Sequence, residues 1–149
     1  MANETSRDLI GTTMSCRHID DLLIVVHQPE LLPSDTEWQS YVRWCKALLQ
    51  QYPSLKVLVV AGEKPPTAAH RSLYNQEIPG DRVRIAVLVT GRPALLVVKV
   101  FAWFVRNIQA FDRQDLPGAL KYLGVVSTPA IKDTILELLG APKTTATSP

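Results

Sequence analysis

The chain has 149 residues, and its 46% hydrophobic and 20% charged residues are typical of one globular domain. A formal net charge of +2 is too small to indicate a nucleic-acid partner by itself. The longest apolar run, residues 94–105, contains Lys99 and is shorter than the roughly 20 residues that cross a bilayer, which argues against a membrane span.

The two ends of the chain differ in composition from the part between them. Residues 1–13 are mostly polar, and residues 141–149 are rich in Thr, Ala and Pro without apolar periodicity. We therefore expect flexible segments at both ends and a single domain at residues 14–140. Cys16 and Cys45 are the only cysteines, and no secretory signal begins the sequence, so we expect a cytoplasmic protein.

The first predicted elements are a hairpin and a helix. Residues 21–27 form a nearly continuous apolar run, typical of a buried strand, and residues 16–19 can pair with it. After Pro33, either Ser34 or Asp35 can cap a helix. Apolar side chains recur there at three- and four-residue spacing: Trp38, Tyr41, Val42, Cys45, Leu48, Leu49 and Tyr52. This spacing predicts one buried helical face.

Strands and helices then alternate. Residues 55–61 and 83–90 are short and rich in Val, Ile and Leu, as expected for strands covered on both faces, and residues 66–78 fit a helix between them. Parallel neighbours require such helical connections. The pattern therefore predicts an α/β fold with a mixed, largely parallel sheet.

Residues 94–105 fit either a strand or a helix by composition, but their length and Pro93 at a first helical position favour a helix. The remaining predicted elements are an edge strand at residues 108–111, a helix at residues 116–123 ending at Gly124, and a helix at residues 129–139 ending at Gly140. The edge strand gives a route to a homo-oligomer.

The bend at residues 62–67, GEKPPT, raises the question of a phosphate loop. It lacks the GxxxxGK[ST] spacing, and Pro65 and Pro66 remove two backbone N–H donors, so nucleotide binding is not expected. The three histidines, His18, His27 and His70, are far apart and lack metal-ligand spacing. We expect His27 and His70 at the surface or at an edge of the fold, and no metal.

Other catalytic signals are weak. Cys45 lies on the apolar helical face, where a buried thiol is a poor nucleophile, and no GxSxG motif occurs. Basic residues accumulate in the second half, but acidic residues interleave with them and the aromatic residues are not spaced for base stacking, so a nucleic-acid site is not expected. We expect no enzymatic activity and no cofactor.

Three segments resemble the SpoIIAA-like branch of STAS domains. They are residues 82–104, which read RVRIAVLVTGRP and later KVFAWF, residues 108–111 (IQAF) and residues 119–124 (ALKYLG). Residues 21–66 agree with that branch in their order of strand, helix and strand. The resemblance implies an α/β, STAS-like fold with a mixed, largely parallel sheet and helices packed mainly on one face. It also implies a non-catalytic bacterial module that signals through protein–protein interaction.

In anti-sigma-factor antagonists of this family, the loop after a central strand and the start of the next helix dock onto a partner kinase and carry the phosphorylated Ser or Thr. By element order, this implies a docking surface at residues 62–72, with these partner-binding residues: Gly62, Lys64, Pro66, Thr67, Ala69 and Ser72. Thr67 and Ser72 are the candidate phosphorylation sites. A phosphate at a helix N-terminus is stabilised by free N–H groups, which favours Thr67.

A second hypothesis rests on the apolar helix expected at residues 93–106. Some α/β folds of this size hold a small hydrophobic molecule beneath such a helix, so the alternative is a binder of a small apolar or lipid-like ligand. A cavity beneath Val97, Phe101 and Trp103 would favour this hypothesis over the docking surface, and a fully packed space there would remove it.

Overall fold

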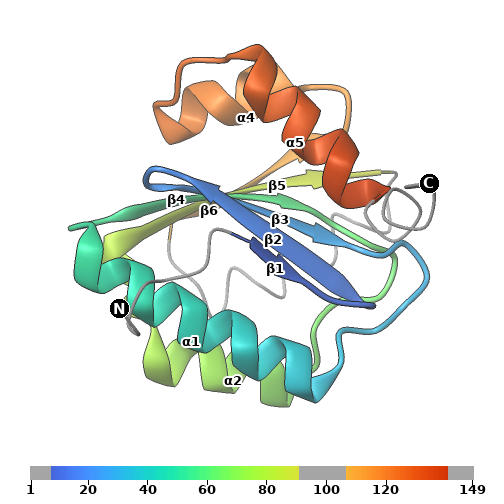
Figure 1. Ribbon diagram of the computed structural model, residues 1–149, viewed down its shortest axis with the longest axis vertical. Coiled ribbons are helices and arrows are strands. Elements are labelled where there is room, and N and C mark those ends of the chain that lie inside the picture. The colour runs from blue at the N-terminus through green and yellow to red at the C-terminus, as the bar shows by residue number, and fades with distance from the viewer. Residues whose placement is uncertain (1–7, 91–106, 141–149) are drawn as a thin grey trace, which may run out of the picture.

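One mixed sheet organises the residues that the computed structural model describes, 8–90 and 107–140 (Figure 1). Its six strands lie in the order in which they occur in the chain: β1 (Asp8–Ile10), β2 (Met14–Ile19), β3 (Leu22–His27), β4 (Leu55–Val60), β5 (Val83–Val89) and β6 (Ile108–Asp112). β1, β2 and β3 pair in antiparallel fashion, whereas β3 to β6 pair in parallel. The predicted mixed, largely parallel α/β sheet is therefore confirmed, and β6 lies at its edge.

Helices connect and cover the strands. They are α1 (Asp35–Gln51), α2 (Ala68–Glu77), the short 3-10 helix η1 (Gly80–Arg82), α4 (Leu116–Leu123) and α5 (Pro129–Leu139). Local chemistry sets their ends as the sequence predicts: the Ser34 hydroxyl accepts the Glu37 N–H at the start of α1, and Gly124 ends α4 at a φ of 74°. The helix predicted at residues 94–105 lies outside the described residues.

The described helices cover both faces of the sheet. Leu23 and Val25 of β3 belong to a core with α1 and α2, whereas Ile24 and Val26 belong to a second core with α4 and α5. Figure 1 shows the two helix pairs on opposite sides of the strands. The expectation that helices pack mainly on one face is therefore wrong for this part of the chain, because the central strands are apolar on both faces and the apolar stripes of α4 and α5 pack against the second one.

The sheet begins earlier than the predicted domain boundary at residue 14. β1 pairs with β2 so that Leu9 lies opposite Cys16, and the Arg17 Nε donates to Asp8 Oδ1 over 2.8 Å. β1 therefore belongs to the sheet, although residues 8–10 lie in the segment that the sequence analysis expected to be flexible.

A carboxylate clamp joins the β1–β2 turn to α1. The side chain of Glu37 accepts hydrogen bonds from the backbone N–H groups of Thr12, Thr13 and Met14, over 2.8, 2.9 and 3.1 Å. Burial alone would raise the pKa of the Glu37 carboxyl, but the hydrogen bonds from Thr13 and Thr12 outweigh it and lower the pKa to about 2. The ionised carboxylate thus holds the edge of the sheet on the first turn of α1.

The described helices do not include one that is both long and apolar enough to cross a membrane.

Candidate functional site

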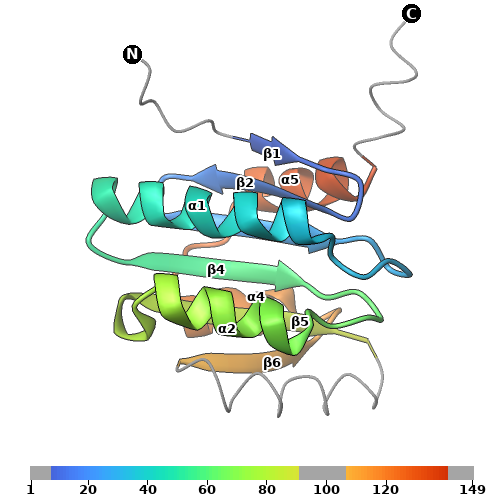
Figure 2. The same ribbon diagram turned by 90° about the horizontal axis from the view of Figure 1, so that it is seen from below.

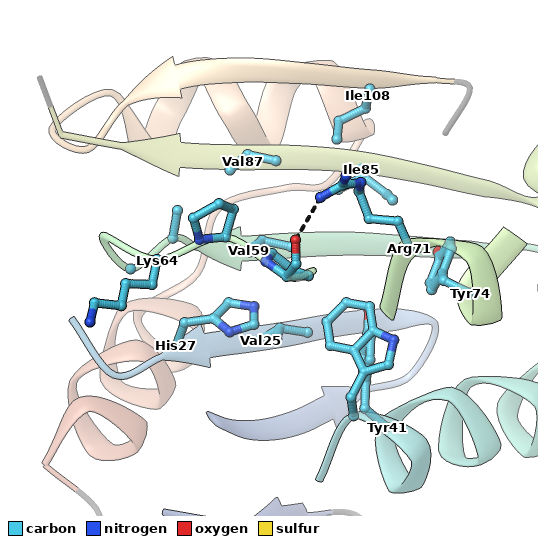
Figure 3. A pocket seen from close by; sticks show the side chains of 15 residues that line it. Val25, His27, Tyr41, Val59, Lys64, Arg71, Tyr74, Ile85, Val87 and Ile108 are labelled. Carbon is cyan, nitrogen blue, oxygen red and sulfur yellow. Dashed lines mark hydrogen bonds between the residues drawn. The ribbon is translucent and has the colours of Figure 1, made fainter. Parts of the chain in front are cut away.

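A pocket lies between the sheet and helices α1 and α2, on the face of the first core (Figure 3). It encloses about 60 Å³, and its surface is almost entirely apolar. The strands contribute Val25, Val59, Ile85, Val87 and Ile108 as its floor, and α1 and α2 contribute Trp38, Tyr41, Arg71 and Tyr74. Seen from below the sheet, α1 and α2 run beside one another beneath it (Figure 2).

The loop after β4 forms part of the rim of the pocket. Gly62, Lys64, Pro65 and Pro66 line it, and Lys64 and Pro65 are exposed. The loop is held by the Glu63 N–H, which donates to the Pro29 carbonyl over 2.7 Å. A side chain at Gly62 would place its Cβ 2.7 Å from the Gln28 carbonyl oxygen, so this close approach requires glycine.

The start of α2 is fixed by a reciprocal cap. The Thr67 Oγ1 accepts the His70 N–H, and His70 Nδ1 accepts the Thr67 N–H, each over 3.1 Å. Because Nδ1 accepts, the ring proton lies on Nε2, which donates to Asp35 Oδ1 over 2.7 Å. The Trp38 Nε1 donates to the His70 carbonyl over 2.8 Å. His70 therefore links the first turns of α1 and α2.

His27, the last residue of β3, brings a buried imidazole to the pocket. Its side chain is 6% exposed, its Nδ1 has no hydrogen-bond partner, and its ring stacks on Trp38 with centroids 6.5 Å apart. Burial lowers the pKa of His27 to about 4. The imidazole is therefore neutral at pH 7, and an uncompensated polar atom lies within an apolar site.

Tyr74 brings a second such group from α2. The residue is 5% exposed, and its hydroxyl has no hydrogen-bond partner. Burial raises the pKa of the Tyr74 phenol, with a smaller contribution from Cys45. The phenol therefore keeps its proton, which makes it a hydrogen-bond donor.

Arg71 lies one helical turn before Tyr74. Its Nη1 donates to the Pro66 carbonyl over 2.6 Å, so the side chain is attached to the rim loop. In Figure 3 the Arg71 side chain runs from α2 toward β5, while Lys64 points away from the other lining residues. Arg71 is therefore the cation of the pocket wall, and Lys64 belongs to the rim.

The predicted docking residues divide between the pocket and the outer surface. Gly62, Lys64 and Pro66 line the pocket, and Pro66 is buried. Ala69 and Ser72 are exposed on α2. The half-buried Thr67 lies between the two groups, and its hydroxyl oxygen already serves as the cap of α2.

Two histidine predictions are wrong. His27 and His70 were expected at the surface or at an edge, but they are 6% and 4% exposed. His70 is buried because Trp38 stacks on its ring, with centroids 5.3 Å apart, while Asp35 satisfies its Nε2. His27 is buried because α1 covers the end of β3. A histidine that ends an otherwise apolar strand was the available signal for the latter.

The sequence analysis also missed Tyr74 as a site residue and treated Arg71 only as part of a basic surface. The signal was their spacing: His70, Arg71 and Tyr74 lie at positions that share one side of a helix. α2 is short and has few apolar residues, so no apolar stripe in the sequence marks the side of the helix that faces the pocket.

Metal ligation and thiol chemistry find no support in residues 8–90 and 107–140. No group of three or more His, Cys, Asp or Glu side chains in these residues is arranged to hold a metal ion. Cys16 and Cys45 are both buried, and burial raises the pKa of Cys45 to about 12.

Comparison of the chain with protein-family models, curated proteins and solved structures finds no match. The function of the protein therefore has to be inferred from the geometry of the pocket.

Proposed function

We propose that this protein is a non-catalytic binding module for a small, mainly apolar molecule with a hydrogen-bonding head, held in the pocket between the sheet and α2. One observation carries the proposal: His27 Nδ1 and the Tyr74 hydroxyl are buried in this apolar site without hydrogen-bond partners among the residues that the structure describes. Each unpaired buried group costs about 1–3 kcal/mol. A ligand that pairs with both groups recovers that cost.

The size of the cavity limits the apolar part of the ligand. The pocket encloses about 60 Å³, whereas an apolar cavity of about 150 Å³ admits benzene. A short aliphatic group therefore suits the described cavity better than a long lipid chain does. The alternative hypothesis placed its ligand beneath the helix expected at residues 93–106, which lies outside the described residues, so the pocket beside α1 and α2 is a different site.

The titration of the pocket groups supports binding rather than catalysis. An efficient general acid or base has a pKa near the working pH. The pKa of His27 is lowered to about 4, and that of Tyr74 is raised by burial, so neither group is suited to proton transfer at pH 7.

Replacing Tyr74 by Phe is expected to move stability and binding in opposite directions. The change removes the unpaired hydroxyl and keeps the ring, so the free energy of unfolding should rise by about 1 kcal/mol. Binding of propanamide, whose amide offers a donor and an acceptor, should weaken about fivefold or more. Urea unfolding measures the first quantity, and amide chemical shifts in an NMR titration measure the second.

Tyr122→Phe is the matched control, because Tyr122 lies on α4 against Phe111, on the other face of the sheet. This variant should leave binding of the probe unchanged. If propanamide shifts no signal of the pocket residues in the wild-type protein, or binds equally to Tyr74→Phe, the proposed pocket function is wrong.

A second candidate function is docking of another protein, such as a regulatory kinase, on the surface formed by residues 62–72. It is favoured by the exposure of Lys64, Ala69 and Ser72 beside the rim, together with the resemblance to SpoIIAA-like domains. Small exposed side chains such as Ala69 permit close approach of a partner, and exposed Ser72 is accessible to a kinase. A homo-oligomer through β6 belongs to the same class of function.

Ala69→Glu is expected to abolish such docking, because it places a charged, longer side chain in the interface. We expect a protein captured by the wild-type chain from its native cells to be reduced at least about tenfold with this variant. Lys132→Glu, an exposed position on α5, should capture it normally. The same partners at the same level with Ala69→Glu would rule out this face.

A further inference from the structure

The charges of the pocket are of one sign. Two cations, Lys64 and Arg71, occur among its described lining residues, and no Asp or Glu does. The guanidinium of an arginine stays protonated at any physiological pH, and the neighbouring His27 is neutral at pH 7. The electrostatic environment inside the pocket therefore favours a ligand with a negative charge.

Arg71 and Tyr74 can act on the same group of a ligand. They lie three residues apart on α2, so their side chains emerge one above the other on one side of the helix. The hydrogen bond from Arg71 Nη1 to the Pro66 carbonyl, at 2.6 Å, holds the guanidinium on the side of the pocket. A planar guanidinium matches the two oxygens of a carboxylate, and a phenol O–H can donate to either oxygen.

We infer that the pocket binds a short aliphatic carboxylate, whose oxygens accept hydrogen bonds from Arg71 and Tyr74 while its apolar end lies on the valine floor. The inference rests on the proposed function and adds the chemical class of the ligand.

The placement of Arg71 and Tyr74 also explains why a carboxylate head group suits the pocket better than a neutral head group does. A carboxylate in an apolar site is stable only with a cation and further hydrogen-bond donors, and Arg71 and Tyr74 supply both. The Tyr74 hydroxyl, which has no hydrogen-bond partner among the described residues, then receives one from the ligand. The cavity of about 60 Å³ restricts the tail to a few carbons.

The test compares two probes of the same shape, propanoate and propanamide, which differ in charge. Their dissociation constants are measured by NMR titration on the full chain at pH 7 and low ionic strength. In the wild-type protein we expect the carboxylate to bind at least about tenfold more tightly than the amide. In Arg71→Gln the two constants should become equal within about twofold, and Arg71→Lys should restore part of the preference.

Lys132→Gln serves as the control for net charge, because it removes an exposed cation from α5 on the opposite face of the sheet. It should leave the preference for the carboxylate intact. If both probes bind equally to the wild-type pocket, the inferred carboxylate is wrong while the proposed binding function stands. If neither probe shifts the signals of His27 and Tyr74, both the inference and the proposed function fail.

Discussion

Acidification from pH 7 to pH 4 is expected to lower the free energy of unfolding by about 3 kcal/mol through His27 alone. Burial lowers the pKa of this histidine from 6.5 to about 4 in the folded protein. Each pKa unit corresponds to about 1.4 kcal/mol, and the difference spans roughly two and a half units.

The sign follows from the protons that each state binds. Above pH 6.5 the imidazole is neutral in both states and contributes nothing. Between pH 6.5 and 4 His27 binds a proton in the unfolded chain but not in the folded protein, so the free energy of unfolding falls as the pH falls. Below about pH 4 both states are protonated and the loss is complete.

Urea unfolding at half-unit steps between pH 7 and pH 4 measures this dependence. His27→Leu removes the titrating group and should flatten the curve above pH 4.5. The control is His18→Gln, at a histidine of β2 whose Nδ1 lies 3.0 Å from the Asp20 carbonyl, and it should keep the wild-type slope. A wild-type protein whose stability is constant from pH 6.5 to pH 5 would contradict a buried, neutral His27.

Glu37→Gln is expected to lower the free energy of unfolding by about 2 kcal/mol at pH 7, the magnitude typical of hydrogen bonds to a charged group. The variant removes the charge that accepts three backbone N–H groups of the β1–β2 turn, at Thr12, Thr13 and Met14. A neutral amide has one oxygen to accept them, and its NH₂ group faces donors. Equilibrium unfolding in urea measures the loss.

The loss of stability caused by Glu37→Gln should depend on pH over a lower range than the stability change caused by protonation of His27. The pKa of Glu37 is lowered from 4.5 to about 2 on folding, so the carboxylate stabilises the fold fully above pH 4.5, and this contribution is lost as the pH falls through about 2. The difference between wild type and variant should shrink over that range. Glu77→Gln, which removes an exposed ion pair with Lys46, should cost less than about 1 kcal/mol. An equal loss from both variants would show that the clamp contributes no more than a surface pair.

Local signals in the sequence were sufficient for most of the elements. Ser34 before an amphipathic run and Gly124 after one are caps whose chemistry acts within a single turn, so the ends of α1 and α4 were predicted correctly. The alternation of strands and helices likewise gave the mixed, largely parallel sheet. These features depend on neighbours in the chain, which a single sequence displays.

The pocket could not be predicted in the same way, because it depends on residues that meet only after folding. His27 is buried by Trp38 from the next helix, and His70 is buried by the same Trp38 together with Asp35. A sequence shows each histidine beside its own chain neighbours, and those gave no reason for burial. The apolar runs of residues 55–61 and 83–90 predicted cover on both faces, whereas the one-face arrangement was implied by the resemblance. Which helices cover each side could not be predicted, because a continuous apolar strand does not identify them.

The link through His70 has a consequence for how the protein can respond to a guest larger than its cavity. The imidazole caps its own helix and binds Asp35, 35 positions earlier in the chain, while Trp38 of that earlier helix binds the His70 carbonyl. Moving α2 outward to make room would pull α1 with it or break both hydrogen bonds between the two helices. Enlargement of the pocket therefore requires α1 and α2 to move together, or both hydrogen bonds between them to break. A molecule small enough to leave the two helices in place binds without that loss.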